Sequence, residues 1–267
     1  MIDSLLLAAA RIGTFEHERG LTNASGFFFE RDDRLFLVTS RHVLIDEPSK
    51  HHPNRIEIEL HTSAADLGQS TGFSLLLYSD GKSIWRQGRD ATGEIDVAVV
   101  EIERSALPVG TVIAAFTPAH LAAATSASGG AGGVEVGSSL LIVGFPLGFH
   151  DTLHHLPVVR QAVLATAFGL RFQGEGYFLT DARTHRGTSG APVVMRDPAA
   201  TAQAPLPWKL LGVHSGRLDM STRDKVQDES LGLNIAWYAD ILMTLTAPAA
   251  NAGSPGLMPP SAPGSPG

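Results

Sequence analysis

Short apolar runs of strand length, separated by turn residues, are the feature that most constrains the fold of this chain. Residues 55–61 alternate apolar and charged side chains with a period of two, which is typical of a half-buried strand. The apolar runs 27–29 and 35–39 flank residues 31–34, which we expect to form a hairpin turn. Residues 139–144 are a further apolar run that ends in a turn, and helical periods are few. The sequence therefore predicts an all-β fold.

Composition excludes several functional classes. The 267 residues suffice for one large domain or two small lobes, and 43% hydrophobic with 18% charged residues is typical of a soluble globular protein. The formal charge of −7, with no cluster of Lys or Arg, argues against a nucleic-acid partner. The absence of cysteine excludes disulfides, thiolate zinc sites and a cysteine nucleophile. Residues 1–10 make a poor signal peptide and are too short to span a membrane, so we expect a cytoplasmic protein with no membrane partner.

The most informative motif is Thr-His-Arg-Gly-Thr-Ser-Gly-Ala-Pro at residues 184–192, which an apolar run follows. Small residues on both sides of Ser189 indicate a tight, exposed turn that leads into a strand. Ser189 is therefore the candidate nucleophile. The backbone N–H groups of Gly187 and Ser189 can converge on one point and hold the oxyanion of a tetrahedral intermediate. Glycine suits this position because it tolerates the required backbone angles and leaves room for substrate.

A serine hydroxyl is a weak nucleophile, so it needs a base and a group that orients the base. His42 follows the apolar run 35–39, and Asp96 opens the apolar strand 95–101. Taken singly, His42 is one of eleven histidines and Asp96 is an ordinary residue at a strand end. Their joint placement with Ser189, each at a strand edge, favours a catalytic set. Three other candidates for the orienting carboxylate open no comparable strand: Asp66, Asp80 and Asp90.

In this order and setting, the three segments resemble the trypsin/chymotrypsin-like serine peptidases, in particular the branch of bacterial glutamyl endopeptidases, HtrA-type proteases and viral 3C-type proteases. The resemblance extends from about Gly26 to Ile241. It implies two six-stranded antiparallel β-barrels with the active site in the cleft between them. His42 and Asp96 would come from the first barrel and Ser189 from the second. It also implies that His42 takes the Ser189 proton while Asp96 holds the other imidazole nitrogen.

The expected organisation is two lobes. Residues 1–121 would form the N-terminal barrel and residues 134–246 the C-terminal barrel, with a short helix over 237–245. Residues 122–133, rich in Ala, Ser and Gly, are the predicted linker between the lobes. Residues 247–267, nearly all Pro, Gly, Ala and Ser, are predicted to be disordered.

The same resemblance suggests a specificity pocket. In the glutamyl endopeptidases and 3C-type proteases, a threonine and a histidine in the positions of Thr184 and His214 line the pocket for the P1 side chain. We therefore predict a preference for Glu or Gln at P1, while a purely structural role for both residues stays equally open. Arg183 argues against a trypsin-like preference for Lys or Arg, which requires an acidic residue there. Backbone groups of Ser215 and Gly216 are expected to pair with an extended substrate as an added strand.

Cofactor and metal binding are not predicted. Four potential metal ligands, His150, Asp151, His154 and His155, lie within six residues. However, no helix is assured there and a second, supporting carboxylate is missing, so the pattern favours a solvated loop. Residues 129–133 also lack the Lys-Ser/Thr that completes a phosphate-binding loop.

The sequence favours a serine endopeptidase that cleaves protein or peptide substrates through a Ser-His-Asp triad and an acyl-enzyme. Residues 187–191 partly mimic the Gly-x-Ser-x-Gly elbow of α/β-hydrolases, but a helix must follow that elbow and residues 192–194 begin a strand instead. The remaining alternative is a protease-like protein-binding module with little or highly restricted activity. The sequence predicts neither the physiological substrate nor the oligomeric state.

Overall fold

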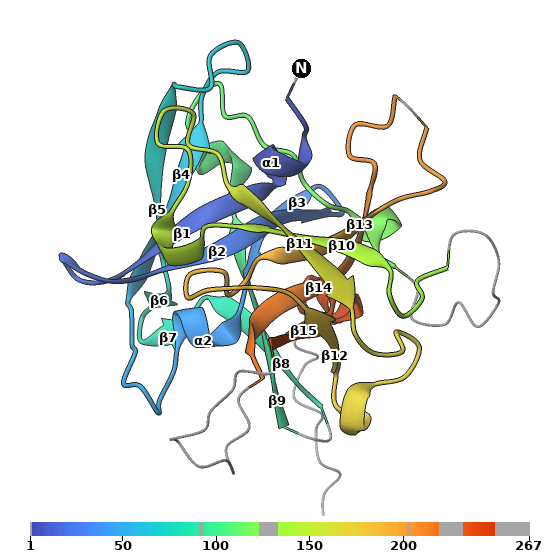
Figure 1. Cartoon of the computed structure of the whole chain (residues 1–267). Helices are drawn as coiled ribbons and strands as arrows, with labels where there is room; N and C mark the ends of the chain where they lie inside the picture. Colours follow the sequence, from blue (N-terminus) through green and yellow to red (C-terminus); the bar gives the residue numbers. More distant parts are fainter. Residues whose placement is uncertain (1, 91–92, 123–132, 202, 219–231, 249–267) are drawn as a thin grey trace, which may run out of the picture.

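Two β-sheets dominate the computed structural model, which describes residues 2–90, 93–122, 133–201, 203–218 and 232–248 (Figure 1). The first is a seven-stranded antiparallel sheet with the strand order β5-β4-β1-β2-β3-β9-β8, coloured blue to green in Figure 1. Its two edge strands, β5 and β8, are not paired with each other. The strands are β1 (Ala9–Glu16), β2 (Arg19–Arg31), β3 (Arg34–Thr39), β4 (Arg55–His61), β5 (Ser70–Leu76), β8 (Trp85–Asp90) and β9 (Gly93–Ile102).

The hairpin between β2 and β3 shows how the sequence sets this sheet. Arg31 pairs with Arg34, so the loop has two residues. Asp32 and Asp33 both take positive φ, 51° and 61°, as the common two-residue hairpin turn requires. The predicted turn at residues 31–34 is therefore confirmed. It places the three phenylalanines of residues 27–29 opposite residues 36–38, and all six side chains are buried.

The second sheet is a closed six-stranded barrel with the order β10-β11-β12-β15-β14-β13. Its core contains buried aliphatic and aromatic side chains from every strand, among them Leu140, Phe178 and Tyr238. The strands are β10 (Ser139–Gly144), β11 (Val158–Leu164), β12 (Tyr177–Asp181), β13 (Pro192–Arg196), β14 (Trp208–Arg217) and β15 (Leu233–Tyr238).

Helical elements are short. The expected helix at residues 237–245 begins two residues late, because Trp237 and Tyr238 still pair with β14 as part of β15. One further hairpin, β6 (Tyr78–Ser79) with β7 (Lys82–Ser83), lies apart from both sheets. The helices and 3-10 turns are α1 (Leu5–Ala8), α2 (Arg41–Leu44), η1 (Arg104–Ala106), η2 (Pro118–His120), η3 (Pro146–Gly148), η4 (Phe172–Gly174), η5 (Ala239–Ile241) and α3 (Leu242–Leu245).

The two sheets share a hydrophobic core. One cluster of buried side chains includes Phe27, Phe29 and Val97 of the first sheet together with Val194 and Leu210 of the barrel. This shared core fixes the facing ends of β2, β3 and β14, where the candidate active site lies. The all-β class and the double-barrel arrangement that the resemblance implied are thus confirmed, with the difference that the first sheet has seven strands rather than six and its edge strands do not pair to close it.

Several expectations stay predictions. Nearly all of the predicted linker, 122–133, and of the predicted disordered tail, 247–267, lies outside the described residues, and the lobe boundaries are not tested. Among the residues described, no helix has the length and apolar character needed to cross a bilayer. The cytoplasmic location is likewise still a prediction.

Candidate active site

Strand pairing brings His42 to Asp96. Thr39, the last residue of β3, pairs with Ala98 of β9, so the chain that continues past β3 lies beside the start of β9. The short helix α2 follows and carries His42. Asp96 then bonds His42 twice: its Oδ1 accepts from the His42 backbone N–H at 2.8 Å, and its Oδ2 lies 2.7 Å from His42 Nδ1. This pairing directs the other imidazole nitrogen, Nε2, away from the carboxylate.

Ser215 supplies a third contact to the same carboxylate. Its hydroxyl donates to Asp96 Oδ2 at 2.5 Å. Ser215 lies where the register of β14 against β15 shifts, between His214 and Gly216. From the sequence, only a backbone role is expected for Ser215. A register shift leaves no clear signal in the residue pattern, so the contact of its hydroxyl with Asp96 could not be predicted.

The surroundings of His42 set its charge. Burial disfavours the imidazolium, but the hydrogen bond and the negative charge of Asp96 outweigh burial and raise the pKa of His42 above its usual value. The Asp96 contact therefore makes His42 a stronger proton acceptor. His42 keeps 39% of its side chain exposed, so it can reach a bound molecule.

Ser189 lies in the turn between β12 and β13, and both lobes hold this turn. Gly190 has φ of 86°, and a Cβ there would lie 2.2 Å from both the Ser25 carbonyl oxygen and Thr39 Oγ1. Only glycine fits that space. The Ser25 N–H donates to the Ser189 carbonyl at 2.9 Å, which ties the turn to β2.

The Ser189 hydroxyl donates to the Ser215 carbonyl at 2.8 Å. Within the described chain, no hydrogen bond joins it to His42. Ser189, His42 and Gly187 nevertheless line one cavity of about 750 Å³. The Ser189 hydroxyl can rotate about the Cα–Cβ bond, and long or misaligned hydrogen bonds are common in active sites before substrate binds.

The backbone beside Ser189 offers two N–H groups that are free to donate hydrogen bonds. Across the described residues, the N–H groups of Gly187 and Ser189 have no hydrogen-bond acceptor. The Leu147 N–H donates to the Arg186 carbonyl at 2.6 Å, and in a trans peptide the Gly187 N–H then points the opposite way. Gly187 has φ of 89°, and a Cβ there would lie 2.8 Å from Leu147 N. Both free N–H groups belong to residues that line the cavity.

Ser25 is a supporting residue that the sequence analysis missed. Its buried hydroxyl donates to the Gly187 carbonyl at 2.7 Å and accepts from the Phe145 N–H at 2.9 Å. It therefore links the Gly187 peptide to the end of β10. Ser25 lies in an Asn-Ala-Ser-Gly stretch that reads only as strand or turn, so the sequence carries no signal for this contact.

Comparison with known proteins identifies the family. The sequence profile described as "Trypsin-like peptidase domain" matches residues 24–199, about two thirds of the chain. The chain belongs to the trypsin-like peptidase family. Its sequence order of His42, Asp96 and Ser189, together with its sheet topology, agrees with the resemblance stated from sequence. No curated protein matches the chain.

Two solved protease structures are similar to this chain at low sequence identity. The serine endoprotease from Yersinia pestis is 16% identical with a TM-score of 0.48, and the match covers 90% of this chain and 61% of that one. The active form of the Rv3671c protease from M. tuberculosis is 15% identical with a TM-score of 0.47, covering 90% of this chain and 80% of that one.

In this trypsin-like peptidase, a second cavity of about 380 Å³ lies beside Thr184. We call it the Thr184 cavity. Thr184 is buried and donates its hydroxyl to Asn234 Oδ1 at 2.5 Å, a partner that the sequence analysis did not name. His214 is not among the lining residues, so the expected Thr184–His214 pair does not face this space together. The cavity is lined by Asp181, Ala182, Arg183, Thr184, His185, Arg217 and Gly232.

His214 lies between the turn that carries Ser189 and the segment that carries His42. Its carbonyl accepts from the Gly190 N–H at 2.7 Å and from the Ser40 hydroxyl at 3.1 Å. Only 1% of the residue is exposed, and its Nδ1 has no hydrogen-bond partner. Burial, reinforced by the nearby His42, lowers the pKa of His214 to about 4. The imidazole is therefore neutral near pH 7.

Proposed function

We propose that this protein is a serine endopeptidase that hydrolyses peptide bonds of protein or peptide substrates. The observation that carries the proposal is the His42 Nδ1–Asp96 Oδ2 contact of 2.7 Å in a cavity that Ser189 also lines. It supplies an oriented base beside a candidate nucleophile, which is the requirement for covalent catalysis by serine.

The proposed reaction has two halves. In the first, Ser189 Oγ attacks the scissile carbonyl carbon and its proton passes to His42 Nε2. The oxyanion accepts hydrogen bonds from the Gly187 and Ser189 N–H groups. His42 then gives its proton to the leaving amine, which departs as the C–N bond breaks, and an ester on Ser189 remains. In the second half, His42 takes a proton from water, the hydroxide attacks the ester, and Ser189 Oγ leaves with the proton from His42.

Labelling with a fluorophosphonate probe tests this function. The wild-type protein should react covalently at one residue, and Ser189→Ala should abolish the reaction because the nucleophile is gone. Ser49→Ala is the matched control, since Ser49 lines the same cavity but its hydroxyl bonds the Asp46 carboxylate. Equal labelling of wild type and Ser189→Ala would overturn the proposal.

We further propose that the Thr184 cavity receives the P1 side chain and selects Glu or Gln. Among the described residues that line it, Arg183 and Arg217 are cationic and Asp181 is the one carboxylate, so this part of the lining carries a net positive formal charge. A positive, polar pocket favours an acidic or amide side chain and disfavours Lys or Arg.

A peptide library scanned at P1 tests this specificity. Substrates with Glu or Gln should give the highest kcat/KM. Arg183→Gln should lower kcat/KM for Glu more than for Gln, because only Glu carries the charge that Arg183 attracts. Dominant cleavage after Arg, Lys or Leu would contradict the assignment while leaving the peptidase function intact.

A protein-binding module with little activity is the second candidate. It is favoured by the bond from the Ser189 hydroxyl to the Ser215 carbonyl, which keeps the nucleophile off His42. If that arrangement persists in solution, the fluorophosphonate probe should fail to label a correctly folded protein that still binds peptides. Labelling at Ser189 would reject this alternative.

A further inference from the structure

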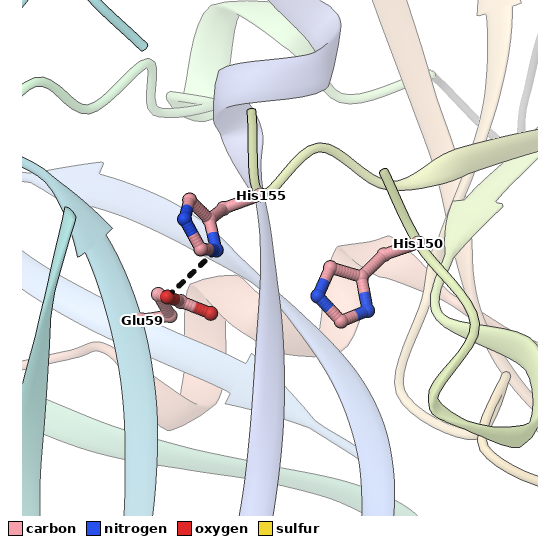
Figure 2. Close-up of side chains that lie close together, drawn as sticks. All are labelled: Glu59, His150 and His155. Carbon is pink, nitrogen blue, oxygen red and sulfur yellow. Dashed lines mark ion pairs between the residues drawn. The ribbon is translucent and has the colours of Figure 1, made fainter. Parts of the chain in front are cut away.

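Three potential metal ligands converge between the two lobes. Glu59 lies on β4 of the first sheet, while His150 and His155 lie on the segment between η3 and β11 of the barrel (Figure 2). One donor atom of each residue lies within 4.8 Å of the other two. Glu59 precedes His150 by 91 residues, so the carboxylate that the sequence analysis found missing comes from the other lobe.

His150 has the hydrogen bond that metal-binding histidines usually make. Its Nδ1 lies 2.7 Å from the Gly148 carbonyl oxygen, so Nδ1 carries the proton and donates it. Nε2 is then left with its lone pair. A backbone carbonyl that fixes the tautomer in this way is a typical outer contact of a ligand histidine. Figure 2 places the His150 ring facing the Glu59–His155 pair.

His155 lies against the carboxylate without forming a hydrogen bond. Its Nδ1 is 2.8 Å from Glu59 Oε1, yet this buried nitrogen has no partner with hydrogen-bond geometry. The residue also has φ of 55°, a conformation that costs energy for a side chain other than glycine. A strained backbone thus brings an unsatisfied nitrogen to a carboxylate oxygen.

Two side chains hold the Glu59 carboxylate in place. Arg11 Nη2 lies 3.0 Å from Oε2, and the Ser70 hydroxyl donates to Oε1 at 2.8 Å. Outer contacts of this kind orient a carboxylate ligand.

We propose that Glu59, His150 and His155 bind a Zn²⁺ ion that links the two lobes. Two imidazoles and one carboxylate are a donor set that zinc accepts, with water as a fourth ligand. Donor atoms around tetrahedral zinc lie about 3.3 Å apart. The donor atoms here lie within 4.8 Å of one another, so the separations must close by about 1.5 Å at most. Glu59 and His155 already lie close together, so the closure falls to His150, which must move while its Nδ1 keeps the Gly148 carbonyl.

The site has a structural role in this proposal, with no part in bond cleavage. His150 follows Leu147 by three residues, and the Leu147 N–H holds the Arg186 carbonyl beside Gly187. Zinc would tie this segment to β4 and so steady the peptide that precedes the candidate oxyanion site. Zinc binding itself does not depend on peptidase activity, so its test stands apart from the proposed function.

The experiment uses the full chain after treatment with a chelator. Zinc titration by calorimetry should give one site, and zinc should raise the thermal midpoint because it binds only the folded protein. His150→Ala, His155→Ala and Glu59→Gln should each weaken zinc binding by about 100-fold or more, and Arg11→Gln by about tenfold. Circular dichroism checks that each variant is folded, and His150→Ala serves if Glu59→Gln fails to fold.

The matched control is His154→Ala. His154 is adjacent in sequence, but its ring pairs with Asp151 at 2.8 Å instead of joining the cluster. Its removal should leave zinc affinity unchanged. A cobalt-loaded protein should show the visible absorption of tetrahedral coordination, and the ligand variants should lose it. Absence of a stoichiometric zinc site, or a site that survives all three ligand substitutions, would overturn the proposal and leave His155 and Glu59 as an ion pair only.

Discussion

The two halves of the candidate active site are held in opposite ways. In the acid–base half, side chains hold side chains: the Asp96 carboxylate contacts the His42 ring, the His42 N–H and the Ser215 hydroxyl. In the nucleophile half, hydrogen bonds to backbone groups hold the turn around Ser189 instead. Contacts to peptide groups at Arg186, Ser189 and Gly190 fix the turn, while the Ser189 hydroxyl points to a carbonyl outside the His42–Asp96 pair.

This difference predicts different sensitivities. One substitution can dismantle the acid–base half, because a single carboxylate makes all three of its bonds. The nucleophile half depends on peptide groups that side-chain substitution cannot remove. Loss of one side chain that supports this backbone should therefore weaken the nucleophile half only in part.

Asp96→Asn should have the largest effect. An amide cannot hold the imidazole in the tautomer that accepts the serine proton, so kcat/KM should fall by about 10⁴-fold, as in other Ser-His-Asp peptidases. Asp96 raises the pKa of His42, and the base works only when neutral. The wild-type rate should therefore rise with pH through a pKa above the usual value for histidine. The acid limb of Asp96→Asn should lie at lower pH.

Steady-state kinetics across pH on peptide substrates measures both effects. Asp66→Asn is the control, since Asp66 is an exposed carboxylate of the first lobe that bonds only its own loop. An acid limb that stays in place in Asp96→Asn would mean that Asp96 does not set the charge of His42.

Low pH should destabilise the folded protein through protonation of His214, which contacts both halves of the site. Its pKa of about 4 in the folded protein lies below the usual value near 6.5, so the unfolded chain binds the extra proton first. The stability from His214 is complete above about pH 6.5 and is lost as pH falls toward 4, by an amount on the order of 3 kcal/mol. Protonation would place a positive charge on a buried imidazole. The carbonyl of the same residue accepts hydrogen bonds from the Gly190 N–H and the Ser40 hydroxyl, so both contacts would be affected.

Denaturant unfolding at several pH values measures this change against His214→Gln. The readout is the dependence on pH, because the substitution itself can lower stability at every pH. His42 contributes with the opposite sign, since its pKa is raised, and it is present in both proteins. Equal slopes in the two proteins would contradict a buried, neutral His214.

Ser25→Ala tests the nucleophile half and should have the smallest effect of the three. It removes the hydroxyl that bonds the Gly187 carbonyl and the Phe145 N–H. Leaving these buried groups unpaired should lower the free energy of unfolding by about 1–3 kcal/mol. Since Gly187 is displaced and not removed, kcat should fall by about 100-fold or less, the lower end for loss of an oxyanion donor.

Thermal unfolding and kcat should be measured together on this variant. Ser74→Ala is the control, because Ser74 is exposed on β5 and makes one long bond of 3.4 Å to Glu57. A full loss of activity in a folded Ser25→Ala protein would mean that the nucleophile half is as fragile as the acid–base half.

The sequence was informative wherever a local pattern determines a local structure. The Asp32-Asp33 turn, the all-β class and the turn around Ser189 follow from residue type and short spacing, since turn residues and strand periods act over a few positions. The predicted start of the helix at residues 237–245 was wrong, because Trp237 and Tyr238 pair with β14, and this pairing overrode the helical pattern of the local sequence.

The residues that support the site through distant contacts could not be predicted from local sequence patterns. Ser25, Leu147 and Asn234 act through contacts with residues more than 35 positions away. The Ser215 hydroxyl also enters the site through its bond to Asp96, and the sequence pattern carries no sign of that contact.

By itself, the sequence determined the strands, the turns and the three residue types that suit a serine peptidase, because each of these depends on neighbours along the chain. The tertiary structure alone decided which oxygen each hydroxyl meets and which carboxylate joins two loop histidines. Such contacts depend on how two sheets pack against a shared core, and packing joins residues that no spacing in the chain relates.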